Sequence, residues 1–106
     1  MNALKGQFGQ TNYSSAKAGM HGFTKALAQE VVKKGVTVNT ISPGYVDTDM
    51  VRAIKTEVLD SIVSSIPMGR LARPEEIAGL VSYLSSDDAG YITGANISIN
   101  GGLNME

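Results

Sequence analysis

The apolar residues in the first third of the chain recur with the period of a helix. They stand three or four positions apart and so fall on one helix face: Ala16, Met20, Phe23, Leu27 and Val31. We expect this helix to begin at Thr11 or Asn12, whose side chains suit an N-cap, and to end at Lys34, because Gly35 is a typical stop. The glycine-containing segment before it, residues 6–10, is expected to be a loop.

A short strand is expected next. Residues 36–42 (VTVNTIS) are rich in β-branched side chains, and Pro43-Gly44 cannot continue a hydrogen-bond ladder. A helix, a short loop and a strand in this order are typical of a parallel α/β sheet. Ligands bind beyond the carboxyl ends of the strands in such sheets, so a ligand is expected at the loop 45–50.

Two further helices are expected in the second half of the chain. Residues 49–66 show a weaker amphipathic pattern that ends at Pro67. A linker, residues 66–73, leads to the next helix, which runs from Pro74 to about Ser85. The two glutamates that follow the proline complement the positive end of the helix dipole. We interpret them as capping residues rather than as a catalytic pair.

The chain ends in a turn and a second strand. Asp87, Asp88 and Gly90 turn the chain, and residues 95–100 (ANISIN) alternate as a strand does. Two strands and three to four helices in this order predict an α/β fold whose strands are adjacent and parallel. The sequence has no internal repeat and no clear domain boundary, so residues 1–106 are expected to form one domain or part of one.

The composition narrows the classes of function. The 106 residues are 42% hydrophobic and 18% charged with a net charge of −1, which indicates neither disorder nor binding to nucleic acid. The absence of cysteine and the single histidine argue against a disulfide framework and a histidine-rich metal site. No apolar run approaches the roughly 20 residues that span a bilayer, and the N-terminus lacks a signal-peptide pattern. A cytoplasmic protein with no metal, membrane or nucleic-acid partner is expected.

Tyr13 and Lys17 are the strongest candidates for chemistry. At a spacing of four they lie about one turn apart on one helix face. A lysine ammonium favours the phenolate and moves the tyrosine pKa from about 10 toward the range where a general acid works best. The spacing alone also arises often by chance in helices. A hydrolase triad is not indicated, because there is no Gly-x-Ser-x-Gly motif and only one histidine.

Four motifs together resemble the short-chain dehydrogenase/reductase family. They are YSSAK, VNTISPGYVDT, RPEEIA and ITGANISINGG, in this order, and the resemblance covers essentially all 106 residues. The sequence is most similar to the bacterial reductases of acetoacetyl-CoA that serve polyhydroxybutyrate synthesis, with the 3-oxoacyl-carrier-protein reductases next. The resemblance implies reduction of a short 3-oxoacyl thioester by NADPH, with NADH not excluded.

The resemblance also assigns roles to individual residues. Tyr13 would donate a proton to the substrate ketone, and Lys17 would lower its pKa and bind the nicotinamide ribose. The loop after the first strand would hold the nicotinamide carboxamide through Pro43, Gly44, Val46 and Thr48. The short acyl group would contact Gln7, Phe8, Gln10 and Tyr45, although packing of the loops is the alternative explanation for these four residues.

Part of the family pattern has no counterpart in this sequence. The glycine-rich turn that binds the cofactor phosphates and the catalytic serine would both precede Met1. We therefore expect a single partial domain, the C-terminal portion of a Rossmann-type doubly wound parallel sheet, without the phosphate-binding half of the cofactor site. Such a chain is expected to be impaired or inactive as a reductase when alone. It is also expected to form a homo-oligomer, because the resemblance implies a tetramer for the complete family fold. The alternatives are a non-catalytic remnant or oligomerisation module, and a fragment of a 3-oxoacyl-carrier-protein reductase.

Overall fold

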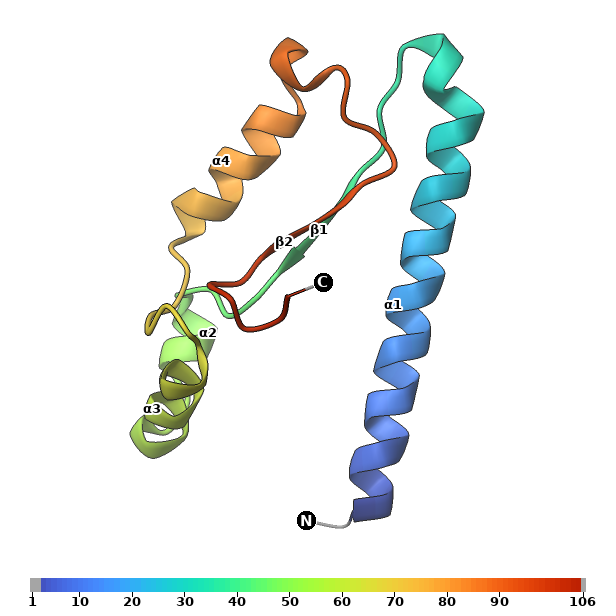
Figure 1. Cartoon of the computed structure of the whole chain (residues 1–106). Coiled ribbons are helices and arrows are strands. Elements are labelled where there is room, and N and C mark those ends of the chain that lie inside the picture. The colour runs from blue at the N-terminus through green and yellow to red at the C-terminus, as the bar shows by residue number, and fades with distance from the viewer. Residues whose placement is uncertain (1–2, 106) are drawn as a thin grey trace. The chain divides into compact units, whose positions relative to one another are not determined.

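The computed structural model describes the backbone of residues 3–105 and the side chains of residues 15–105. Over this part of the chain, four α-helices and two strands follow one another in an α/β arrangement, as expected (Figure 1). No helix within it is long and apolar enough to cross a membrane. The elements are α1 (Ala3–Val31), β1 (Thr40–Pro43), α2 (Asp49–Arg52), α3 (Thr56–Ser65), α4 (Pro74–Leu84) and β2 (Asn96–Ile99), with short 3-10 helices at Val32–Lys34 and Asp87–Ala89.

β1 and β2 pair as a two-stranded parallel sheet (Figure 1). The amide of Thr40 donates to the carbonyl of Ala95 at 2.9 Å, and the amide of Gly44 donates to that of Ile99 at 3.0 Å. An advance of four residues along one strand thus matches four along the other, which is the register of a parallel pair. The expected adjacent and parallel strands are confirmed.

β1 begins after residues 36–39 rather than with them. These residues bond in part through side chains: the amide of Val38 donates to Oγ1 of Thr93 at 3.0 Å, and Oδ1 of Asn39 accepts from the amide of Ala95 at 3.0 Å. Side-chain acceptors therefore replace part of the backbone ladder in a segment that β-propensity alone predicts as regular strand.

α1 begins at Ala3, so the loop expected over residues 6–10 is wrong. Five of the eight residues from 3 to 10 are strong helix formers, namely Ala3, Leu4, Lys5, Gln7 and Gln10, whereas each of the two glycines costs only about 1 kcal/mol. The far end of the helix agrees with expectation. The last turn tightens into the 3-10 helix, and Gly35 closes it in the left-handed conformation (φ 78°), donating its amide to the carbonyl of Val32.

The single helix expected over residues 49–66 is two helices, α2 and α3. The break covers residues 53–55, and Lys55, the residue before α3, has non-helical backbone angles (φ −53°, ψ 140°). Val51, Ile54 and Val58 keep a spacing of three and four across the break, so the apolar pattern does not reveal it. The helix expected from Pro74 is confirmed to within one residue, and the aspartates after it form a short 3-10 turn.

The chain divides into two compact units. The first comprises Met1–Thr40 and Thr93–Ala95, and the second comprises Ile41–Ile92 and Asn96–Glu106. In the first unit, α1 presents the buried side chains of Thr24 and Ala28.

Small side chains make the interior of the first unit. Oγ1 of Thr24 lies 2.7 Å from Oγ1 of Thr40, within hydrogen-bond distance. A Cβ atom placed on Gly94 would lie 3.6 Å from Cβ of Ala28, which is ordinary van der Waals contact. The helix therefore meets the returning segment 93–95 at close range, as its small residues allow.

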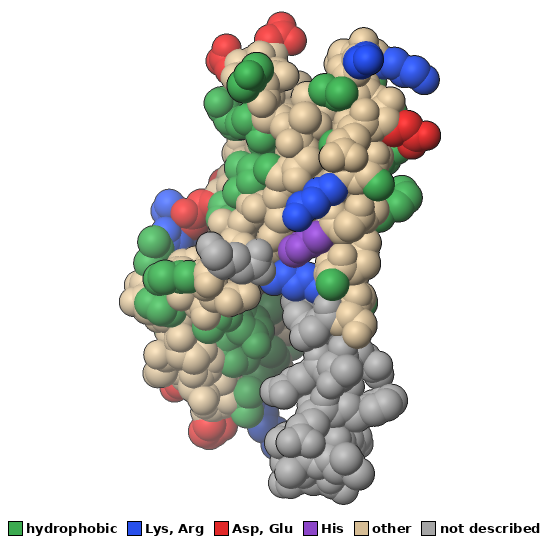
Figure 2. Space-filling model, turned by 45° about the vertical axis from the view of Figure 1, so that its right-hand side comes forward, with side chains coloured by type: hydrophobic (Ala, Val, Ile, Leu, Met, Phe, Trp, Pro, Cys, Tyr) green, Lys and Arg blue, Asp and Glu red, His purple; other side chains and the backbone are tan. Residues whose placement is uncertain are grey.

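Little apolar surface is buried in either unit. Within residues 15–105, the buried hydrophobic side chains are Ala28, Ile66 and Ala89, and no large side chain is fully buried. Large apolar side chains lie on the surface instead, and hydrophobic groups are visible among the described residues on the face that Figure 2 shows. Phe23 and Met20 of α1 are 68% and 58% exposed. Each unit therefore has a small core and exposed apolar surface.

Candidate functional site

The expected proton donor and its partner lie on one uninterrupted helix. Tyr13 and Lys17 are one turn apart in α1, so the spacing that links them is helical, as predicted. The side chain of Lys17 is half-buried, whereas that of Tyr13 lies outside the described side chains. Gln7, Phe8 and Gln10 also belong to the backbone of α1 rather than to a loop, and their side chains too lie outside that range.

The expected cofactor loop follows β1 in the second unit. Gly44, its first residue after the strand, hydrogen-bonds to Ile99 and approaches Asn100 very closely. A Cβ atom at Gly44 would lie 2.8 Å from Cβ of Asn100, so glycine is the residue that fits here. Pro43 ends β1, where its missing amide hydrogen costs no ladder bond.

The loop is tied along its length to Ala72. The amide of Ala72 donates to the carbonyl of Tyr45 at 2.9 Å, and the amide of Asp47 donates to the carbonyl of Ala72 at 2.8 Å. Val46, between them, forms an isolated parallel bridge with Ala72. Two backbone hydrogen bonds to one residue thus determine the path of residues 45–47.

Thr48 and Asp47 then connect the loop to α2. Oγ1 of Thr48 accepts from the amide of Val51 at 3.3 Å and caps the helix. The Asp47 carboxylate pairs with the Arg52 guanidinium through two hydrogen bonds, of which the Nη2–Oδ2 bond is 2.7 Å long. Arg52 lowers the pKa of Asp47, and Asp47 raises the pKa of Arg52. The loop is therefore anchored at both ends.

Tyr45 lines a cavity of about 330 Å³ in the second unit. The cavity lies at the carboxyl end of β2, the end of the strands at which parallel sheets bind ligands. It combines apolar groups with one ion pair. Its lining is Tyr45, Met68, Arg70, Ala72, Glu76 and Ser98–Gly102.

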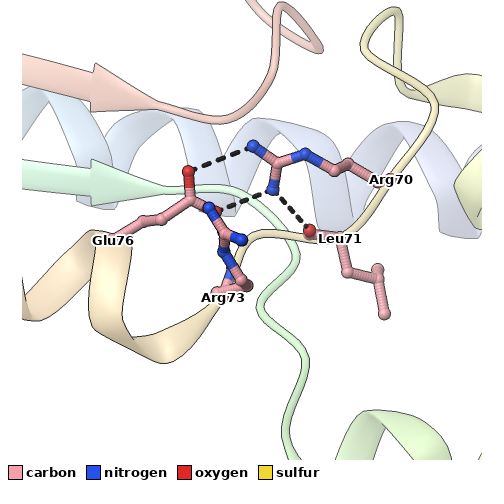
Figure 3. A network of polar contacts seen from close by, with 4 residues as sticks. All are labelled: Arg70, Leu71, Arg73 and Glu76. Atoms are coloured by element: carbon pink, nitrogen blue, oxygen red, sulfur yellow. Dashed lines mark hydrogen bonds and ion pairs between the residues drawn. The ribbon is translucent and has the colours of Figure 1, made fainter.

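Arg70 and Glu76 form the ion pair of this lining (Figure 3). Nη1 of Arg70 donates to Oε1 of Glu76 at 2.7 Å, and Nη2 donates to Oε2 at 3.1 Å. Oε1 also accepts from the backbone amide of Arg73 at 2.9 Å. The Arg70 hydrogen bond and then the Arg73 amide lower the pKa of Glu76 from 4.5 to about 2, and Glu76 raises the pKa of Arg70.

Sequence reasoning found the loop but missed its supports. Glu76 does cap α4 as interpreted, because its carboxylate accepts from the amide of Arg73. Its pairing with Arg70 joins positions six apart across a proline, a spacing that no helix or strand rule indicates. Arg52 and Asp47 are five positions apart on either side of the start of α2, a spacing that likewise follows from no helix or strand rule. No group of three histidine, aspartate or glutamate side chains in the described part of the chain could hold a metal ion.

The predicted residues fall into two groups. Tyr13 and Lys17 belong to the first unit, whereas the loop from Gly44 to Thr48 belongs to the second. Within the second unit, Tyr45, Val46 and Thr48 lie in one loop that is held by Ala72 and by the start of α2.

A comparison with known families and proteins identifies related sequences. Residues 1–104 match a family model described as enoyl-(acyl carrier protein) reductase, which represents short-chain dehydrogenases/reductases. The chain is 66% identical over 105 residues to an acetoacetyl-CoA reductase of Cupriavidus necator, covering 99% of this chain and 43% of the relative.

Two other relatives extend the comparison. An acetoacetyl-CoA reductase of Allochromatium vinosum is 62% identical over 105 residues, which are 99% of this chain and 43% of the relative. A 3-oxoacyl-[acyl-carrier-protein] reductase of Pseudomonas aeruginosa is 50% identical over 100 residues, which are 94% of this chain and 40% of the relative. The chain thus spans less than half the length of these relatives.

Proposed function

The chain belongs to the short-chain dehydrogenase/reductase family, and we propose that it serves in the NADPH-dependent reduction of acetoacetyl-CoA to 3-hydroxybutyryl-CoA. The observation that carries this proposal is the identity of 66% to a reductase of that name, against 50% to a reductase of 3-oxoacyl-carrier protein. The reaction belongs in the cytoplasm, in polyhydroxybutyrate synthesis. Because the chain spans 43% of that relative, the activity is proposed for a complete fold, and the chain alone is expected to be impaired or inactive.

The residues after β1 fit the nicotinamide end of the cofactor. Thr48 is exposed, and its hydroxyl keeps a hydrogen to donate after accepting from Val51. Val46 is held between the two hydrogen bonds to Ala72, so its backbone offers a fixed contact. In this proposal Pro43, Gly44, Val46 and Thr48 hold the carboxamide. NADPH, or NADH, would supply a hydride to the ketone carbon.

Tyr13 and Lys17 carry the proton chemistry in this proposal. Tyr13 donates a proton to the ketone oxygen, and Lys17 lowers its pKa by charge and binds the ribose hydroxyls. Proton transfer from a positioned group is typically worth about 10² to 10⁴ in rate. Gln7, Phe8, Gln10 and Tyr45 contact the acyl group, and Tyr45 already lines a cavity in its own unit.

Exposed apolar surface supports a second candidate, a non-catalytic assembly module. Phe23 and Met20 lie one turn apart on α1, beside Gly19 and Gly22, at which an added Cβ atom would meet nothing within 4 Å. Such a face suits close packing with another helix. The homo-oligomer proposed for the complete fold is compatible with either function.

A chimera separates the candidates. Residues 1–105 replace the matching part of the Cupriavidus necator reductase, and NADPH oxidation is measured with acetoacetyl-CoA and with acetoacetyl-carrier protein. The proposal expects turnover, faster with the CoA thioester, which Tyr13→Phe lowers by about 10² or more. Tyr91→Phe, at a fully exposed tyrosine, is the control. An inactive but folded chimera would favour the assembly module, and preference for the carrier-protein thioester would favour the other reductase.

A further inference from the structure

The Glu76 carboxylate binds residues on both sides of Ala72, the residue that supports the loop after β1. Ala72 lies between Arg70 and Arg73, and Glu76 binds both of them (Figure 3). Glu76 itself stands in the first turn of α4, where its own amide donates to the carbonyl of Arg73 at 2.9 Å. The helix therefore fixes the carboxylate, and the carboxylate fixes the chain on both sides of Ala72.

The same segment is secured at its other end. The amide of Met68 donates to the carbonyl of Gly101 at 3.0 Å, and the amide of Gly69 donates to that of Ile66 at 2.8 Å. Nη1 of Arg70 also donates to the carbonyl of Leu71 at 3.2 Å. Residues 68–73 thus form a short segment that is held at both ends. In the bonds described above, Ala72 is the residue of this segment that bonds to the 45–47 loop.

We propose that Arg70 and Glu76 are positioning residues for the Tyr45–Thr48 loop, acting through Ala72. The geometry of the pair is specific, because a guanidinium and a carboxylate join by two parallel bonds and fix direction as well as distance. A lysine cannot make this fork. The consequence for catalysis rests on the proposed function: the pair sets how Val46 and Thr48 meet the nicotinamide ring, without touching the substrate.

A surface ion pair with no positioning role is the competing explanation. The Arg70 and Glu76 side chains are 50% and 31% exposed, and exposed pairs usually contribute little to global stability. The two explanations differ in which backbone amides would lose protection from hydrogen exchange when the ion pair is broken. A positioning pair affects the amides of Ala72 and Asp47 selectively, whereas a generic pair affects no particular site.

Amide hydrogen exchange of the chain itself, followed by NMR, tests the proposal without any cofactor. Glu76→Gln is expected to speed exchange of the Ala72 and Asp47 amides about two- to fivefold, with that of Leu59 in α3 unchanged. Glu75→Gln is the matched control, since it removes the same charge from the same exposed turn. Equal effects of the two variants, or none at Ala72 and Asp47, would overturn the proposal.

Two further measurements keep the test decisive. Should Glu76→Gln unfold the chain, which faster exchange at Leu59 would reveal, Arg70→Lys keeps the charge but removes the fork. It is expected to speed the same two amides, and unchanged rates would contradict the proposal. In an active chimera, Glu76→Gln should raise KM for NADPH several-fold with kcat little changed. An inactive chimera would count against the proposed function, while the exchange data would still decide the positioning role.

Discussion

Gly44 and Asn100 approach each other so closely that only glycine fits at position 44. A Cβ atom there would lie 2.8 Å from Cβ and 3.0 Å from Cα of Asn100, and the second of these belongs to the backbone. Because backbone cannot swing aside as a side chain can, Gly44→Ala must move the end of β1 away from the end of β2.

We predict that Gly44→Ala lowers the free energy of unfolding by about 1–3 kcal/mol, the usual cost of overpacking. Gly79→Ala is the control, because an added Cβ at this exposed position of α4 meets nothing within 4 Å. It is expected to stabilise the chain by up to about 1 kcal/mol through helix propensity. Urea unfolding followed by circular dichroism measures both. Equal stability of wild type and Gly44→Ala would contradict the close approach.

Acid is predicted to destabilise the second unit through Asp47 and Glu76. Folding lowers the pKa of both carboxyls, so the unfolded chain binds protons first as the pH falls. Their contribution is complete above the unfolded values of 3.8 and 4.5 and declines toward pH 2, the folded pKa of Glu76 being about 2. Urea midpoints measured from about pH 6 to about pH 2 should fall across this window. The decline should be shallower in Glu76→Gln than in the matched variant Glu75→Gln.

Lys17 is predicted to set the pH dependence of the chimera. Lys17→Met removes the charge that favours the phenolate, so the pH–rate profile should move to higher pH and kcat at neutral pH should fall about 10² or more. Lys25→Met, on the same helix two turns later, is the control and should leave the profile in place. A uniform loss of rate with no displacement of the profile would mean that Lys17 does not tune Tyr13.

The isolated chain is predicted to associate. Phe23 and Met20 are 68% and 58% exposed, and few apolar residues among those described are buried, so burial of these side chains between copies would remove apolar surface from water. Sedimentation velocity should show mass rising with concentration. Phe23→Asp should reduce it, whereas Met105→Asp, at another exposed apolar residue, should not. A monomer with a sharp melt that is independent of concentration would rule this out.

Local sequence rules predicted the elements well where one signal dominates. Pro74 and the acidic turn after it located α4, and Gly35 located the end of α1, because each acts through its own backbone geometry. The rules failed where two different backbone structures are compatible with the same sequence pattern. Glycine at positions 6 and 9 predicts a loop, although its cost in a helix is small, and the apolar pattern of residues 49–66 continues across the break at residues 53–55.

The candidate site was predictable only in part for a different reason. The loop from Pro43 to Thr48 follows from the strand that precedes it, whereas the roles within it came from family resemblance. Its supports come from residues distant in sequence, since Ala72 and Glu76 are brought to it by folding. No pattern in a single sequence encodes which surface arginine will meet which glutamate.

The return of segment 93–95 to the first unit has a consequence for synthesis. The amide of Val38 can form its native hydrogen bond only after Thr93, 55 residues further along the chain, has been synthesised. At ribosomal speeds of about 5–20 residues per second, this interval lasts roughly 3–11 s. During this interval Ala28 of α1 lacks its native contact with Gly94, so this face of the helix stays open until segment 93–95 has been synthesised.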